Sequence, residues 1–172
     1  MRFAYADPPY MGQAKKHYGK EASYAGEVDH GELIDRLCCE FPDGWALSAS
    51  TPSLRHILPL CPDDVRIAAW VKPFAAFKVN VNPAYAWEPV LFRGGRKRSR
   101  KEQTVRDWVS AVITLQRGLP GVKPEPFCFW LFDLLGLQYG DELVDLFPGS
   151  GAVTRAFERW QGQLALSSRD GE

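Results

Sequence analysis

A short segment near the start of the chain combines a carboxylate, two prolines and an aromatic ring. Asp7-Pro8-Pro9-Tyr10 directly follows the apolar and aromatic run 2–6, which predicts a buried strand. Two successive prolines cannot continue a sheet ladder, so the strand is expected to end at Asp7. A carboxylate would then sit on a stiff elbow at the carboxyl end of a strand, where open α/β sheets bind ligands. An ordinary Asp-Pro turn is the alternative interpretation.

A glycine-containing loop joins a predicted strand to a predicted helix near the end of the chain. The strand over 142–147 runs into Pro148-Gly149-Ser150-Gly151, and a helix is predicted over 152–160. Glycines let a ligand approach the backbone closely, and a helix N-terminus offers unpaired N–H groups. The third glycine of the dinucleotide pattern is missing, and no lysine follows as in a P-loop. This loop, with Asp145 at the strand end, favours a nucleoside-type cofactor; a plain tight turn is the alternative.

Positive charge gathers in two places, although the net charge of the chain is +0. A nucleic-acid partner would therefore have to be recognised by a local patch rather than by overall charge. One group stands just after the elbow and could belong to a loop that closes over a substrate: Lys15, Lys16, His17 and Tyr18. The other group could contact phosphates or form a solvated face: Arg93, Arg96, Lys97, Arg98, Arg100 and Lys101.

The composition is that of a globular protein and sets limits on other functions. The chain has 172 residues, of which 45% are hydrophobic and 24% charged, and this length predicts a single domain over 1–172. Four cysteines and three histidines show no metal-ligand spacing, so no metal site is expected. No leader-like segment or membrane span is recognisable, and we expect a cytoplasmic protein without a membrane partner.

Strands and helices alternate along most of the chain. Strands are expected over 2–6, 45–49, 65–71, 87–92, 142–147 and 163–167. Helices are expected over 30–41, 54–60, 127–137 and 152–160, while 103–115 could be either strand or helix. This alternation predicts an α/β fold with a mostly parallel central sheet.

Three segments of the chain resemble motifs of one enzyme family. Asp7-Pro8-Pro9-Tyr10 resembles the catalytic motif of the amino-methyltransferases that act on DNA, and Asp145-Leu146-Phe147-Pro148-Gly149-Ser150-Gly151 resembles their S-adenosylmethionine (SAM) loop. Lys123-Pro124 resembles the Lys-Pro that commonly precedes that loop. The catalytic motif comes first and the cofactor motif last, as in the circularly permuted β-type enzymes. The resemblance spans nearly the whole chain.

The resemblance implies a fold, a reaction and a set of site residues. The fold would be a Rossmann-like three-layer sandwich, and the reaction SAM-dependent methylation of the exocyclic N6 amine of adenine in a flipped-out or unpaired DNA base. The catalytic residues would be Asp7, Pro8, Pro9 and Tyr10. The cofactor would be held by Ala6, Asp7, Lys123, Asp145, Phe147, Pro148, Gly149, Ser150 and Gly151. No metal is required.

Several alternatives stay open on the sequence alone. Cytosine-N4 methylation uses the same chemistry, and RNA is a less favoured substrate than DNA. A non-catalytic, nucleic-acid-binding subunit is the hypothesis from another class, and the chain could also act as a homodimer or with a separate specificity subunit. In the family an acidic residue ends the strand after the SAM loop; here the predicted strand over 163–167 lacks one, and Asp170 is the nearest acid.

The region available for reading a DNA sequence is short. The resemblance places target recognition between the two halves of the chain, where only the basic insertion over 93–122 is found. Because phosphate contacts position a protein and base contacts specify the sequence, we predict weak or short sequence specificity. Methylation of randomised DNA would measure it; a stringent site of about six base pairs read by this chain without a partner would contradict the prediction.

Overall fold

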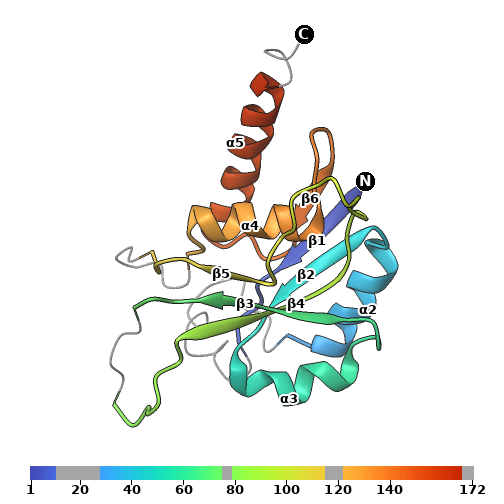
Figure 1. The fold of residues 1–172 in the computed structure, drawn as a ribbon. Helices are drawn as coiled ribbons and strands as arrows, with labels where there is room; N and C mark the ends of the chain where they lie inside the picture. The colour runs from blue at the N-terminus through green and yellow to red at the C-terminus, as the bar shows by residue number, and fades with distance from the viewer. Residues whose placement is uncertain (11–27, 75–78, 115–121, 168–172) are drawn as a thin grey trace.

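The computed structural model describes residues 1–10, 28–74, 79–114 and 122–167, and its centre is a six-stranded sheet (Figure 1). The sheet has the order β5-β3-β4-β2-β1-β6. Its strands are β1 (Arg2–Ala6), β2 (Gly44–Ser48), β3 (Arg66–Val71), β4 (Trp87–Gly94), β5 (Trp108–Ser110) and β6 (Glu142–Asp145). Of these strands only β4 runs against the rest, because it pairs antiparallel with both β2 and β3. The other three pairings are parallel, so the predicted mostly parallel sheet is confirmed.

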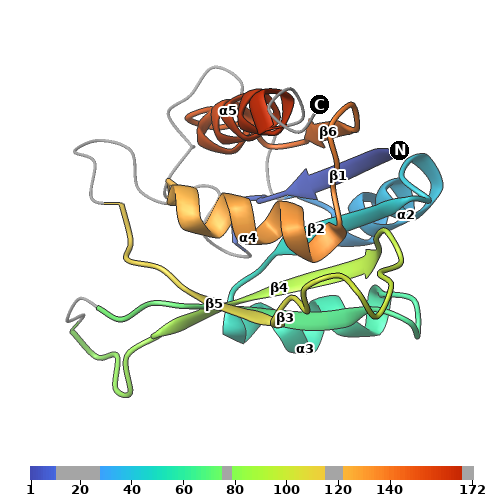
Figure 2. The same ribbon diagram turned by 45° about the horizontal axis from the view of Figure 1, so that its top comes forward.

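Helices cover both faces of the sheet, which gives three layers (Figures 1 and 2). On one face lie α4 (Glu125–Leu135) and α5 (Ala152–Ser167). On the other lie α2 (His30–Glu40) and α3 (Leu54–Ile57), with short 3-10 turns at Thr51–Ser53 and Leu58–Leu60. The α/β sandwich expected from the sequence is therefore confirmed. None of the described helices is long and apolar enough to cross a membrane.

The alternation of side chains along β1 explains why both faces are covered. Phe3 and Tyr5 are fully buried in the cluster formed with α4 and α5, whereas Ala4 and Ala6 are fully buried in the cluster formed with α2 and α3. Successive side chains of a strand point to opposite faces, so a strand buried on both sides reads as a continuous apolar run. This is the pattern seen in the sequence.

Capping residues determine where two of the helices begin or end. The Asp29 carboxylate accepts hydrogen bonds from the backbone N–H groups of Gly31 and Glu32, at 2.8 and 3.1 Å, and caps α2, which begins at His30 as the predicted helix over 30–41 does. In the second half of the chain, α4 stops at Gly136, whose φ of 68° is left-handed and suits glycine.

The strand predicted over 163–167 is wrong, because α5 continues through this segment to Ser167. Val153, Ala156 and Trp160 recur at helical spacing and belong to the core cluster with α4. The residues that follow are mostly Gln, Leu and Ala, which favour a helix and include no β-branched side chain. The described chain therefore has no strand after the glycine loop, and Asp170 lies outside the described residues.

The topology brings several polar residues to one edge of the sheet. β1, β2, β3 and β6 all end at this edge, which we call the carboxyl edge. Because β4 is reversed, it begins there instead, and its Glu88 pairs in register with Trp70 near the end of β3. The strand ends Asp145 and Ser48 lie at the same edge.

Gly94 ends β4 at the opposite edge of the sheet, in a backbone conformation that favours glycine. Its φ is +72°, and a Cβ added there would lie 2.9 Å from the carbonyl oxygen of Asp43. We therefore predict that Gly94→Ala lowers the free energy of unfolding by about 1–3 kcal/mol, measured by urea denaturation.

Gly162 provides the control, because a Cβ there would meet nothing within 4 Å and the residue lies inside α5. Gly162→Ala should raise the free energy of unfolding by about 0.5–1 kcal/mol. Equal stability of the two variants would contradict the backbone constraint assigned to Gly94.

Candidate active site at the carboxyl edge of the sheet

The elbow after β1 places one carboxylate at the carboxyl edge. β1 ends at Ala6, and the next residues leave the sheet at Asp7-Pro8-Pro9-Tyr10, as the two prolines predict. Pro8 is buried, whereas Pro9 and Tyr10 are half-buried. The Asp7 side chain keeps 23% of its surface exposed, so a ligand at this edge can reach the carboxylate.

A buried ammonium group bridges Asp7 to a second carboxylate. The Nζ of Lys123 lies 3.2 Å from Oδ1 of Asp7 and 3.0 Å from Oε2 of Glu88. Only 4% of the Lys123 side chain is exposed. Lys123 stands in the short segment before α4, so the bridge ties that segment to both β1 and β4.

Lys72 extends the bridge into an alternating chain of charges. Its ammonium forms an ion pair with the other oxygen of Glu88, Oε1. The two ammonium groups lie over aromatic rings: both Nζ atoms face Trp70, at 4.7 Å for Lys72 and 5.2 Å for Lys123. Phe127 is 5.6 Å from the Lys123 Nζ on the α4 side. We call Asp7, Lys123, Glu88 and Lys72 the ion cluster.

The two carboxylates of the ion cluster have pKa values shifted in opposite directions. Burial raises the pKa of Asp7, and the attraction of Lys123 offsets only part of this effect. Burial also disfavours ionised Glu88, but the charges of Lys123 and Lys72 outweigh it and lower the pKa of Glu88. The difference follows from the number of partners, because Glu88 is paired with two cations and Asp7 with one.

The buried lysine stays protonated because anionic groups surround it. Burial by itself would lower the pKa of Lys123, but the negative charge of Asp7, together with that of Glu88, raises it well above its ordinary value. Burial likewise raises the pKa values of Tyr5 and Tyr10, so both phenols are neutral near pH 7.

A buried hydrogen bond between two strands holds the end of β1, from which the elbow leaves the sheet. The hydroxyl groups of Tyr5 and Ser48 lie 2.8 Å apart and join the ends of β1 and β2. On the other side, Tyr5 is in register with Asp145 of β6, and its carbonyl accepts a hydrogen bond from the backbone N–H of Leu146. The elbow is therefore held by both neighbouring strands.

The glycine loop follows β6 directly beside the elbow. The Asp145 carboxylate accepts hydrogen bonds from the backbone N–H of Phe147 at 3.3 Å and from the Thr154 hydroxyl at 3.4 Å. Gly149 and Gly151 adopt φ values of +47° and +70°, which favour glycine. A Cβ at Gly149 would find no atom nearer than 3.9 Å, so the backbone there is open to a ligand.

The structure brings most of the predicted cofactor residues together, with two exceptions in detail. The loop 147–151 and Asp145 share the carboxyl edge with the elbow. Ala6 is fully buried, so it can offer only backbone atoms. Lys123 contacts the two carboxylates of the ion cluster rather than the glycine loop.

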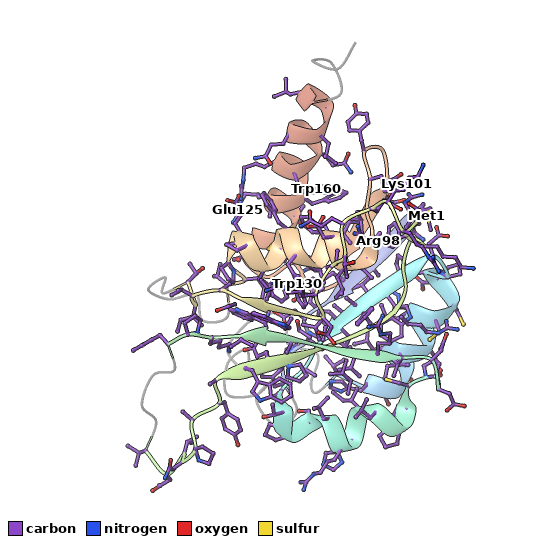
Figure 3. All side chains as sticks on the ribbon, viewed as in Figure 1. Met1, Arg98, Lys101, Glu125, Trp130 and Trp160 are labelled. Atoms are coloured by element: carbon purple, nitrogen blue, oxygen red, sulfur yellow. The ribbon has the colours of Figure 1, made fainter. Side chains whose placement is uncertain are left out.

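The predicted phosphate strip lies at the opposite edge of the sheet. Glu88 and Gly94 stand at the two ends of the eight-residue β4, whose length is about 25 Å. Arg98 and Lys101 lie on the side of Met1, where β1 begins (Figure 3). The other predicted group, Lys15, Lys16, His17 and Tyr18, lies outside the described residues.

Half of the strip is already engaged in the fold. Arg93 pairs with Asp64 at 2.6 Å, and Arg96 forms a two-pronged ion pair with Asp141 at 2.7 and 2.9 Å. Arg98 donates to backbone carbonyl oxygens. Lys97, Arg100 and Lys101 are exposed, and none of them has an ion-pair partner among the described residues.

Sequence reasoning missed Glu88 and Lys72 as site residues. Glu88 stands at the start of a predicted strand, before Pro89, where an exposed glutamate is commonplace. Glu88 reaches the site because β4 runs antiparallel to its neighbours, and no local sequence pattern predicts that direction. A charged residue inside the otherwise apolar run 87–92 was the available signal.

The fold is similar to those of solved structures, although sequence comparison finds no match. No protein-family model matches the chain, and neither does any curated protein sequence. The fold is similar to the crystal structure of the M1.HpyAVI–SAM complex, with a TM-score of 0.63 and 15% identity over 93% of this chain and 78% of that chain. A second crystal structure of M1.HpyAVI gives a TM-score of 0.58 and 13% identity, over 94% and 76%. This likeness establishes the type of fold.

The ion cluster predicts how its two carboxylates titrate. Asp7 should titrate above the ordinary range of an aspartate, and Glu88 below that of a glutamate. Side-chain carboxyl ¹³C shifts, followed by NMR from acid to neutral pH, would measure both pKa values. An Asp7 pKa below the ordinary aspartate value of about 3.9 would contradict the arrangement described here.

Proposed function

We propose that this chain is a SAM-dependent methyltransferase that transfers a methyl group to the exocyclic N6 amine of adenine in DNA. The observation that carries the proposal is the adjacency of β1 and β6, which sets the Asp7 elbow beside the glycine loop at one edge. The similarity of the fold to M1.HpyAVI, whose structure was solved with SAM, supports it. The two motifs that resemble the amino-methyltransferases are the two segments that meet.

The backbone conformation of the glycine loop and the polar groups around it suit the binding of SAM. The backbone at left-handed Gly149 is open, and the first N–H groups of α5 have no carbonyl partner within the helix. Asp145 and the residues 147–151 would hold the cofactor, with the Ala6 backbone beside them. When bound, the cofactor supplies an electrophilic methyl group on a sulfonium.

The elbow is suited to bind an amine and to stabilise its developing charge. An exocyclic amine is a poor nucleophile, because its lone pair is delocalised into the base. The Asp7 carboxylate, together with the Pro8 carbonyl, can accept hydrogen bonds from the amine and favour the geometry needed for attack. The same oxygens stabilise the positive charge that appears on nitrogen before it loses a proton. Tyr10 would stack on the base.

A nucleic-acid partner is favoured because exposed aromatic side chains stand on the β3–β4 connection at the carboxyl edge. Phe74, Tyr85 and Trp87 are 56%, 53% and 40% exposed, and they stand at the base of the β3–β4 connection, next to Lys72 and Glu88. Exposed aromatic rings stack on unpaired bases, and the target base has to leave a duplex to reach such a site. Lys97, Arg100 and Lys101 are available for phosphate contacts further along the duplex.

A non-catalytic subunit is the second candidate, and one observation favours it. Because α5 replaces the predicted last strand, no acid-bearing strand follows the glycine loop within the described residues. A weakened cofactor site would fit a methyltransferase-like chain that binds nucleic acid for a partner. Cytosine-N4 is the alternative target atom within the enzyme class.

The proposal predicts a clean separation between methyl transfer and cofactor binding in one variant. Asp7→Ala should reduce methyl transfer to DNA by a factor on the order of a thousand. Its affinity for SAM, measured by calorimetry, should fall far less than methyl transfer, because Asp145 and the loop over 147–151 are untouched. Transfer is measured with labelled SAM.

Asp63→Ala is the matched control, since Asp63 is exposed in a turn away from the carboxyl edge. It should keep wild-type activity. Full activity of Asp7→Ala would overturn the proposed mechanism, and a wild-type chain that binds no SAM would support the subunit instead.

A further inference from the structure

We propose that Glu88 is a positioning residue of this site, which holds the Lys123 ammonium so that one oxygen of Asp7 is engaged and the other faces the substrate amine. The inference rests on the proposed methyl-transfer function and adds to it a residue outside the three motifs. Glu88 would not touch the substrate. It would act through Lys123.

The geometry assigns the bridging position to Lys123 and the anchoring role to Glu88. The Lys123 Nζ contacts Oδ1 of Asp7 at 3.2 Å and Oε2 of Glu88 at 3.0 Å. No hydrogen bond from another described residue reaches the second Asp7 oxygen, Oδ2. That oxygen is therefore the one available to a ligand at the partly exposed side of the carboxylate.

Glu88 itself is fixed more firmly than Asp7. It lies on a strand between two others, opposite Trp70 in the β3–β4 register, and Lys72 engages its other carboxylate oxygen. The Pro89 carbonyl that follows accepts a hydrogen bond from the backbone N–H of Ala49, at 3.0 Å, which anchors the start of β4 against the end of β2. A lysine side chain has four rotatable bonds, so a fixed second partner is what confines its ammonium.

The charges also favour this role. The ion cluster has two carboxylates and two ammonium groups, so its net charge is zero. Without the Glu88 charge, two cations would face a single carboxylate, and Lys123 would be drawn fully onto Asp7. The site would then oppose the positive charge that develops on the amine, and Asp7 would become a weaker acceptor.

The test compares two variants that should shift the pKa of Asp7 in opposite directions. The charged or titratable groups that face Asp7 from the elements around it are Lys123, Glu88, Lys72, Tyr5, Tyr10 and Asp145. Glu88→Gln removes an anion, so the Asp7 pKa should fall below its wild-type value. Lys123→Met removes a cation and should raise it. Carboxyl ¹³C NMR titration measures both shifts without any need for activity.

The kinetic part of the test separates positioning from structural damage. Glu88→Gln should lower kcat by a factor on the order of ten to a hundred, with KM for SAM nearly unchanged. The acid limb of its pH–rate profile should move to lower pH, because Asp7 has to be ionised. The double variant with Lys123→Met should lose less activity relative to Lys123→Met than Glu88→Gln loses relative to the wild type, since Glu88 would act chiefly through Lys123. The Glu88 carboxylate also accepts a hydrogen bond from the Tyr10 hydroxyl, which accounts for any remaining effect.

Glu142→Gln is the matched control for the loss of a glutamate charge. Glu142 pairs with Arg2 at the opposite edge, and its loss should move neither the Asp7 pKa nor kcat. If Glu88→Gln does not fold, Glu88→Asp keeps the charge, and it should retain the wild-type direction of the Asp7 shift with a reduced kcat.

Two outcomes distinguish failure of this inference from failure of the proposed function. If Glu88→Gln changes neither the Asp7 pKa nor kcat in an active enzyme, the inference is overturned and the proposed function still stands. Opposite pKa shifts in a chain that methylates no nucleic acid would overturn the proposed function instead.

Discussion

The buried Lys123 ammonium between Asp7 and Glu88 is the interaction on which the candidate site depends. It joins β1, β4 and the segment before α4, three parts of the chain that are distant in sequence. Burial of a charge is costly without a partner, so the Lys123 ammonium is stabilised by both carboxylates beside it. The reversed β4 makes the bridge available, because β4 begins at the carboxyl edge and so places Glu88 at the same edge as the end of β1, with β2 between them.

The two edges of the sheet serve different purposes. The elbow, the ion cluster, the glycine loop and the exposed aromatic residues of the β3–β4 connection all lie at the carboxyl edge. At the opposite edge, ion pairs from Arg93 and Arg96 tie the end of β4 to Asp64 and Asp141. Much of the basic segment that the sequence suggested for phosphate binding is therefore engaged in ion pairs that stabilise this end of the sheet. A DNA duplex that reaches Lys97, Arg100 and Lys101 would have to extend from one edge to the other.

Local patterns predicted those parts of the structure that local chemistry determines. The double proline ends β1, Asp29 starts α2, and the left-handed glycines form the loop after β6. The role of Glu88 could not be predicted, because it depends on strand order and direction. The strand expected over 163–167 was wrong because a short apolar run does not distinguish strand from helix, and packing of Trp160 and its neighbours on α4 favours the helix. Lys123 was found as a motif residue, but its partners came only from the fold.

The claim that β1 and β6 together form a methyl-transfer site is tested most directly by the product. DNA would be incubated with the chain and SAM carrying a deuterated methyl group, digested to nucleosides and measured by mass spectrometry. We expect labelled N6-methyldeoxyadenosine that increases with time and is absent without the chain. Absence of label from every nucleoside, while the same preparation binds SAM, would contradict the claim.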